Sequence, residues 1–434
     1  MKRIAVFALI TVMLLSLCAC GAEKQANDGP LKAKEGTLLV GFGRVDLTPK
    51  GNMELMGYTE TRMMTGVMDP IYATCVAITD SKGSTVLIYT LDTLEADESA
   101  TGMLRSKVAQ KLGIPKDNMV VSATHTHSAP HSVGIPGYVD LLVQAAETAM
   151  KDRAAATIQA GDTQIEGMNF VRHYNTDQGK VIGDNFGTVE EDGARISHTT
   201  QADGQMQLIR FVREGDKKDV LMVNWQAHPK LASTSETPEG RGNRSLLSAD
   251  FVGHCRLQVE GNSDCLFAYY SGASGNLNPR SMIPQENMPN GNQVTVFGKT
   301  LGDHVLNALE GLQSVEAGTV QLQRKHQEIN LAGSSTKQTK DITAITIGKI
   351  GFAAVPFEMF DTTGMQIKED SPCDITFVLT CCGSGGYIPA AYTWDYNSGD
   401  ARLMPYEAKR CRYDIGSAEV IADSLLQMLN SLEQ

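Results

Sequence analysis

The sequence predicts one large mixed α/β domain, built as layered sheets with flanking helices. Short apolar, β-prone runs alternate with helical patterns along the chain, which is typical of this class rather than of a β-sandwich. Hydrophobic residues make up 42% of the sequence, enough for a large core. No internal repeat or abrupt change in composition divides the chain, so we expect residues 37–434 to form a single domain.

The elements are expected in a definite order. Strand-like runs occupy residues 37–49, 72–80, 84–94, 118–127, 204–214, 220–229, 320–331, 342–360 and 374–389. Helical patterns occupy residues 100–113, 138–153 and 417–434. Residues 176–204 and 231–247 are polar, and we interpret them as surface loops beside a site.

The first residues have the form of an export signal. In residues 1–19, two basic residues precede an apolar run that is too short for a stable spanning helix. Leu17-Cys18-Ala19-Cys20 resembles a bacterial lipobox, in which the cysteine after a small residue is lipidated, and residues 20–36 follow as a polar, flexible tether. We therefore expect an exported lipoprotein, anchored at a bacterial membrane surface through lipidated Cys20 and facing outside the cytoplasm. Plain secretion after cleavage is the alternative.

The net charge excludes one class of partner. The sequence carries a net charge of −12, and removal of Lys2 and Arg3 with the leader makes it −14. Nucleic-acid binding requires an excess of basic residues, so we expect no nucleic-acid partner.

Seven cysteines remain besides Cys18 and Cys20, and their odd number and irregular spacing predict no disulfide framework. Cys373, Cys381 and Cys382 could form a soft-metal site, but they lack a C-x-x-C pair. Buried or occasionally paired thiols are the interpretation we favour.

The densest group of potential ligands is ATHTHSAPH, residues 123–131, which holds three of the nine histidines. The apolar run before it predicts a buried strand, and α/β proteins commonly build their sites at strand ends. We expect His125 and His127 to point to opposite faces at this strand end and to have separate roles. We interpret His131 and His173 as loop residues or as residues that support the site.

Four residues with ligand-type side chains stand at the ends of four predicted strands. They are His125, His228, Glu358 and Tyr387. A zinc ion takes three or four nitrogen, oxygen or sulfur ligands from a rigid frame, and such strand ends supply one. Taken singly, however, each of these residues more often has a core or loop role, so the spacing alone leaves both interpretations open.

Several short segments follow one another in an informative order. They are GFGRVDLTP, MGY, DPIYATCVAI, VLIYTLDTL, SATHTHSAP, NWQAHP, SADFVG and GNLNP. In this order they resemble the N-terminal catalytic domain of the neutral/alkaline (non-lysosomal) ceramidase family. No single segment is highly specific, but the ordered set covers most of residues 38–420.

The resemblance implies a zinc-dependent amidase that hydrolyses an N-acyl linkage, as in the conversion of ceramide to a sphingoid base and a fatty acid in sphingolipid metabolism. Carried over residue by residue, it implies zinc ligands at His125, His228, Glu358 and Tyr387. It also implies that His127 and Arg172 contact the substrate carbonyl and the developing oxyanion. Tyr387 would in addition relay a proton.

The sequence departs from the family pattern in two places. Asn278 in GNLNP stands where the family has a serine in Gly-Asp-Val-Ser-Pro. We also expect no C-terminal immunoglobulin-like domain, because the sequence ends at residue 434. These departures keep two alternatives open: a metal-dependent hydrolase of a different amide or ester, and a non-catalytic substrate-binding lipoprotein.

Replacing Cys20 by Ala should release the protein from the membrane fraction or leave its precursor unprocessed, because lipid on this cysteine is the expected anchor. Cys18→Ala is the matched control and should do neither. Membrane fractionation with immunoblotting measures both, and identical behaviour of the two variants would show that the lipobox assignment is wrong.

Overall fold

A nine-stranded sheet forms the frame of the structure, a computed structural model that describes residues 33–183, 192–234, 244–280, 293–396, 400 and 402–433. Its strands are β1 (Leu38–Asp46), β5 (Tyr72–Thr79), β6 (Thr85–Leu91), β7 (Met119–Ala123), β8 (Ala154–Gln164), β13 (Gln205–Arg213), β14 (Asp219–Trp225), β16 (Cys265–Ser271) and β18 (Gln313–Val315). Eight follow the order β16-β14-β13-β8-β1-β5-β6-β7, and β18 pairs with β8. Most pairs are antiparallel, but β14–β16 and β6–β7 are parallel. Parallel strands are usually buried on both faces, and every residue of β6, β7 and β14 is buried.

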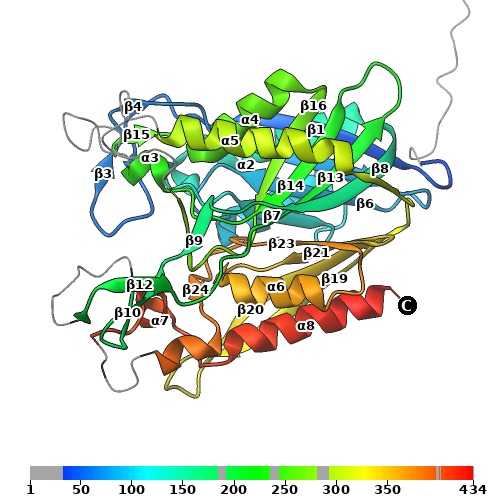
Figure 1. Cartoon of the computed structure of the whole chain (residues 1–434). Coiled ribbons are helices and arrows are strands. Elements are labelled where there is room, and N and C mark those ends of the chain that lie inside the picture. Colours follow the sequence, from blue (N-terminus) through cyan, green and yellow to red (C-terminus); the bar gives the residue numbers. More distant parts are fainter. Residues whose placement is uncertain are drawn as a thin grey trace, which may run out of the picture. The chain divides into compact units, whose positions relative to one another are not determined.

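Four helices cover one face of this sheet, and Figure 1 shows helices lying along that face. They are α1 (Glu98–Leu112), α2 (Tyr138–Asp152), α4 (Asp250–Asn262) and α5 (Gln293–Ala308). Alternation along β5 sorts the side chains, since Ala73, Cys75 and Ala77 join the core under α1 and α2. A Cβ on Gly43 of β1 would lie 2.1 Å from the carbonyl oxygen of Ala145, so glycine lets α2 pack directly on the strand.

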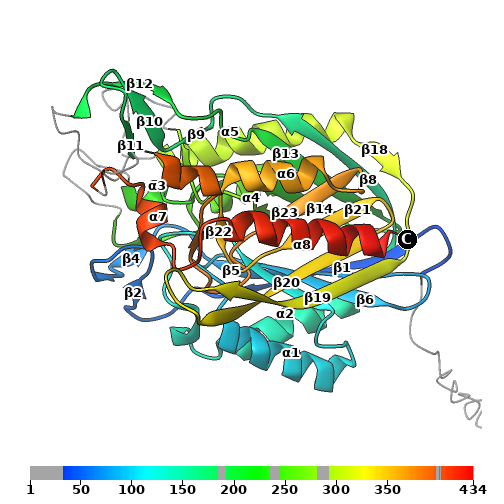
Figure 2. The same cartoon turned by 90° about the horizontal axis from the view of Figure 1, so that it is seen from below.

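The opposite face packs against a second sheet of order β19-β20-β21-β23. Its strands are β19 (Val320–Asn330), β20 (Lys337–Ile347), β21 (Ile350–Ala354) and β23 (Ile375–Leu379). Val76 and Ile78 of β5 face this sheet, where Phe352 and Phe377 stack edge to face with ring centroids 5.6 Å apart. Helices α6 (Asp361–Glu369) and α8 (Ser417–Leu432) cover its outer face, so the layers run helix, sheet, sheet, helix (Figure 2).

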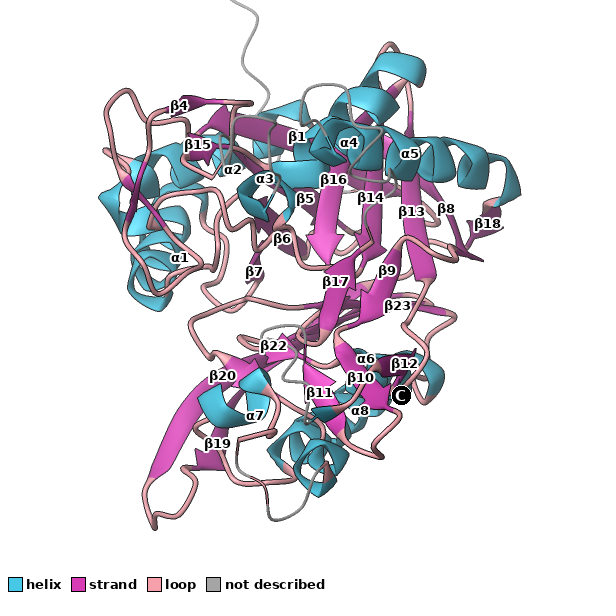
Figure 3. Ribbon diagram, turned by 60° about the vertical axis from the view of Figure 1, so that its left-hand side comes forward, coloured by secondary structure: helices cyan, strands magenta, loops and turns pink. Residues whose placement is uncertain are grey.

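Short elements gather beyond the strand ends. In Figure 3, β9 (Asn169–Val171) and β17 (Leu277–Pro279) form an antiparallel pair beyond the end of β16. A second pair, β22 (Glu358–Met359) and β24 (Tyr387–Ile388), is parallel. The remaining elements are β2 (Glu54–Leu55), β3 (Arg62–Met63), β4 (Gly66–Val67), β10 (His173–Thr176), β11 (Val181–Gly183), β12 (Arg195–His198), β15 (Leu246–Leu247), α3 (Leu231–Thr234) and α7 (Tyr406–Arg410), with short 3-10 turns at Ser132–Gly134, Leu309–Gly311 and Ala391–Asp395.

The predicted fold class, mixed α/β with layered sheets and flanking helices, is confirmed. Helices α1, α2 and α8 lie where the sequence predicted them, but α4, α5 and α6 were not predicted. The expected run 342–360 is divided by a turn at Gly348, whose φ is 58°, into β20, β21 and the separate β22. The leader, the tether and Cys20 lie outside the described residues, and no helix in the described part is long and apolar enough to cross a membrane.

Candidate metal centre

The four ligand-type residues of the sequence analysis lie together in the structure. His125 follows β7 by two residues, and His228 follows β14 by three. Glu358 and Tyr387 begin β22 and β24 and lie directly opposite each other in that parallel pair. The ends of the large sheet thus supply the imidazoles, while the chain that leaves the second sheet supplies the carboxylate and the phenol.

The two imidazoles are held with the same edge facing inward. Nδ1 of His125 lies 2.7 Å from the carbonyl oxygen of Leu94, and Nδ1 of His228 lies 2.8 Å from that of Ser274. Because a carbonyl oxygen only accepts, each Nδ1 donates, and the neutral ring then carries its lone pair on Nε2. Both Nε2 atoms are buried without a hydrogen-bond partner.

The carboxylate of Glu358 completes this convergence. Its Oε2 lies 3.2 Å from Nε2 of His125 and 3.3 Å from Nε2 of His228. This oxygen is also buried without a hydrogen bond. Three atoms with free electron pairs therefore point at one another, an arrangement that a cation placed among them would stabilise.

The charge states agree with that interpretation. Burial, with Arg172 nearby, lowers the pKa of His228 to about 4, so this ring is neutral near pH 7. Burial also lowers the pKa of His125, but Cys381 and Glu358 outweigh it and raise that pKa. Burial raises the pKa of Glu358, but His125 and His228 outweigh it and hold that pKa well below its usual range. The site therefore attracts positive charge, as a proton on His125 or as a metal ion.

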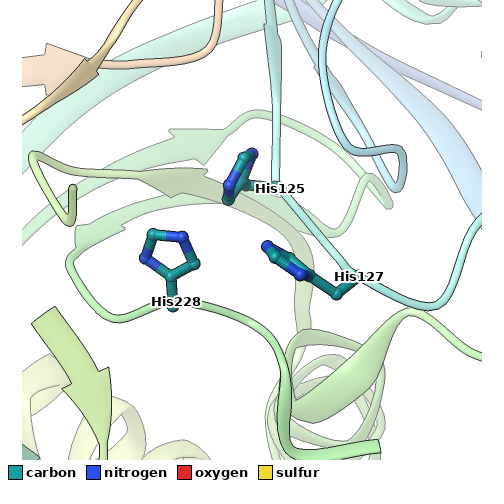
Figure 4. Close-up of side chains that lie close together, drawn as sticks. All are labelled: His125, His127 and His228. Carbon is teal, nitrogen blue, oxygen red and sulfur yellow. The ribbon is translucent and has the colours of Figure 1, made fainter. Parts of the chain in front are cut away.

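His127 lies on the same side as His125, so the expectation that the two rings point to opposite faces was wrong: alternation has a period of two residues and places residues i and i+2 on one face. Strand β7 ends at Ala123, and His125 has a left-handed φ of 70°, which turns the chain before His127. Figure 4 shows the rings of His125, His127 and His228 around a common space, and their ligand atoms lie within 4.8 Å of one another. By distance alone, these three histidines could also hold a metal ion.

Gly57 fixes the position of the His127 ring. A Cβ at residue 57 would lie 2.6 Å from atoms of this ring, and the φ of Gly57 is 102°. Tyr58 packs its ring edge to face on His127, with ring centroids 5.3 Å apart. Both ring nitrogens of His127 are buried and lack a hydrogen-bond partner within the described structure.

Arg172 contacts Tyr387 rather than the imidazoles. Its Nη2 donates to the hydroxyl of Tyr387 at 3.2 Å and to the carbonyl oxygen of Gly275 at 2.6 Å. Its Nε donates to the carboxylate of Glu407, which also lies 3.0 Å from Nε2 of His173. Glu407 was not predicted from the sequence, because it belongs to the short helix α7 and has no motif around it.

The GNLNP segment (275–279) and Ser274 before it hold His228 and Arg172 through backbone carbonyl oxygens. Carbonyl oxygens of residues 274, 275 and 277 accept hydrogen bonds from Nδ1 of His228, from Arg172 and from the backbone of His228. Asn278 is buried in β17, opposite Phe170 of β9.

Seven cysteines are free thiols in the described structure, and among them Cys381 lies with Sγ 3.4 Å from Nδ1 of His125. The soft-metal trio has no support, because the described residues that group as potential metal ligands are the three histidines.

A pocket of about 340 Å³ opens beside the centre. His125, His127 and Glu358 line it, together with an aromatic wall of Tyr58, Tyr387 and Tyr406. His131 lies outside this pocket and contributes to a smaller adjoining one. The pocket can therefore bring a partly apolar ligand against the convergent atoms.

Comparisons with known proteins agree with this geometry. Residues 38–265 match the family described as "Neutral/alkaline non-lysosomal ceramidase, N-terminal". Two proteins named "Neutral ceramidase", from Drosophila pseudoobscura pseudoobscura and Drosophila melanogaster, are 26% and 25% identical over 280 residues, which are 57% of this chain and 37% of each relative. The match thus spans little more than a third of the length of these relatives.

Two solved structures share the fold. A neutral ceramidase from Pseudomonas aeruginosa superposes with a TM-score of 0.72 at 14% identity, and a structure titled "Ceramidase complexed with C2" does so with a TM-score of 0.71 at 15% identity. Each covers 92% of this chain and 75% of the other. At such identities the likeness shows the fold alone.

Replacing Glu407 by Gln should lower the free energy of unfolding by about 3–5 kcal/mol, because it leaves Arg172 buried without its counter-charge. Burial raises the pKa of Glu407, but Arg172 and His173 outweigh it and hold that pKa below its usual range. The carboxylate therefore stabilises the fold above the ordinary carboxyl pKa, and this contribution is lost as the pH falls. Urea unfolding at about pH 7 and about pH 4 measures the change and its pH dependence.

Glu328→Gln is the control, because Glu328 forms an exposed ion pair with Lys337 and should contribute less than about 1 kcal/mol. The role given to Glu407 would be contradicted if the two substitutions lowered stability equally. It would also be contradicted if acidification destabilised Glu407→Gln as much as the unmodified protein.

Proposed function

The chain belongs to the neutral/alkaline non-lysosomal ceramidase family, and from this membership we propose that it is a zinc-dependent amidase that hydrolyses an N-acyl linkage. The observation that carries the proposal is the convergence of two buried Nε2 atoms on Oε2 of Glu358 at 3.2 and 3.3 Å. Ceramide or a related N-acyl lipid or small molecule is the substrate class that the family suggests.

The residues present fit a zinc ion. His125, His228 and Glu358 would hold it, because their buried inward-facing atoms converge and lack hydrogen-bond partners. Tyr387 would be the fourth ligand, since it lies opposite Glu358 and its ring stacks on that of His228, with centroids 6.5 Å apart. When bound, zinc would supply a Lewis acid that polarises a carbonyl oxygen and lowers the pKa of water.

The surrounding side chains would position the amide and move protons. His127 faces the pocket with both ring nitrogens unpartnered, so it can hydrogen-bond the substrate carbonyl or exchange a proton with the leaving amine. Arg172 donates to the hydroxyl of Tyr387 and so stabilises negative charge on that oxygen. Tyr58 and Tyr406 supply apolar surface for the substrate and limit the access of water.

A second candidate is a metal-dependent hydrolase of a different amide or an ester. Asn278 favours it, because this buried residue stands where the family has a serine. Hydrolysis assays on N-acyl sphingoid bases, N-acyl amino acids and simple esters separate the two. A non-catalytic substrate-binding role would leave all of them uncleaved.

We also propose that the protein is an exported lipoprotein held at the membrane by Cys20. The basis is the leader sequence with its lipobox-like segment, and the Cys20 and Cys18 variants test it. A membrane anchor would keep the enzyme close to lipid substrates.

The purified protein should contain close to one zinc per chain. His125→Ala should lower the zinc content sharply, because it removes one of the two imidazole ligands. His127→Ala should keep most of the zinc but lower turnover on a cleaved N-acyl substrate by about a hundredfold or more, the loss expected for one oxyanion or proton-transfer contact. Elemental analysis and steady-state kinetics measure both effects.

His326→Ala is the control, because His326 is 74% exposed and far along the chain from the centre, on β19. It should change neither quantity. Equal zinc loss in the His125 and His127 variants would favour a three-histidine site, and a protein that neither contains nor takes up zinc would refute the proposed function.

A further inference from the structure

Two arginines line the pocket that holds the metal centre. Arg410 ends α7, and Arg412 follows it by two residues. Both side chains are exposed, and neither forms an ion pair with a carboxylate in the described part of the chain. In contrast, Arg402 of the same segment is paired with Asp192. Guanidinium groups at a pocket wall without a counter-charge are available to an anionic ligand.

These arginines lie close to the proposed ligand Tyr387. The rings of Tyr387 and Tyr406 are 5.7 Å apart, and Arg410 lies over the ring of Tyr406 with Cζ 5.3 Å from its centroid. Nη2 of Arg412 would lie 3.8 Å from a Cβ on Gly386, the residue before Tyr387. An anionic group a few bonds from a scissile amide at the centre could therefore reach them.

The pocket is positive although the protein is acidic. Glu358 is the single carboxylate among the described residues that line it, against a net charge of −12 for the whole sequence. Arg62 is 5% exposed and lies over the ring of Tyr58, a pocket residue, with Cζ 4.4 Å from the ring centroid. It donates to carbonyl oxygens of Arg244, Met56 and His127 rather than to a carboxylate. A metal ion at the centre would raise the potential further.

We propose that the preferred substrates are N-acyl amino acids, in which a carboxylate on the leaving amine pairs with Arg410 and Arg412. This inference rests on the proposed amidase function and narrows its substrate class. The aromatic wall accepts the acyl chain, while the arginines select the amine. A neutral N-acyl sphingoid base offers these arginines only hydroxyl groups, which bind a guanidinium more weakly than a carboxylate does.

Binding measurements test this without requiring hydrolysis. The probes are N-(octylsulfonyl)glycine and N-(octylsulfonyl)ethanolamine, in which an uncleavable sulfonamide replaces the amide. The two probes have the same alkyl chain. The glycine probe ends in a carboxylate, whereas the ethanolamine probe ends in a neutral hydroxymethyl group. Calorimetry on the purified protein should show that the glycine probe binds about tenfold more tightly than the ethanolamine probe. A single exposed ion pair raises binding affinity only a few-fold, and two ion pairs act together here. The preference should fall as salt is added.

The variants assign the preference to the two arginines. Arg410→Gln with Arg412→Gln should bring the two affinities within about twofold of each other, by weakening binding of the glycine probe alone. The double Lys variant keeps the charges and should keep most of the preference. Arg402→Gln is the matched control from outside the pocket and should leave both affinities unchanged.

Equal affinities in the unmodified protein would overturn the inference, as would a preference that survives the double Gln variant or a failure of both probes to bind. Because both probes are short and soluble, attraction of the arginines to an anionic lipid surface cannot produce the preference. Failure of the proposed function shows differently, as absence of zinc and of amide cleavage.

Discussion

The shared position of Oε2 of Glu358 between two imidazole Nε2 atoms is the constraint on which the rest of the site depends. A buried carboxylate without a counter-charge costs several kcal/mol, and the ring of His228, which is neutral near pH 7, cannot offset that cost. A proton on His125 or a metal ion among the three atoms supplies the missing positive charge. The carbonyl oxygens of Leu94 and Ser274 each accept a hydrogen bond from Nδ1 of one ring, which leaves Nε2 of that ring facing inward.

The layered fold brings these groups together from distant parts of the chain. The large sheet supplies His125 and His228 just beyond the ends of β7 and β14, two strands that are fully buried. Glu358 and Tyr387 come from the chain that leaves the second sheet and are registered by the short β22–β24 pair. Glu407 then ties α7 to Arg172, so the segment that carries Arg410 and Arg412 is anchored to the centre by a buried ion pair.

Part of this site could be predicted from the sequence, because the end of an apolar run indicates where a buried strand ends. Strand ends and the ordered family segments together identified four ligand-type residues, namely His125, His228, Glu358 and Tyr387. The rings of His125 and His127 were expected on opposite faces, and this expectation failed because residues two apart along a strand share a face. Glu407, Arg410 and Arg412 could not be predicted, since their place at the pocket depends on long-range packing of a five-residue helix. The unpredicted α4 has glycine at Gly253 and Gly261, which weakens its helical pattern.

Anomalous X-ray diffraction at the zinc edge from crystals of the purified protein tests the central claim most directly. The account predicts one peak within about 2.0–2.2 Å of Nε2 of His125, Nε2 of His228 and a carboxylate oxygen of Glu358. A peak bound by His127 in place of Glu358, or a centre in which a protonated His125 donates to Glu358 after incubation with zinc, would contradict it.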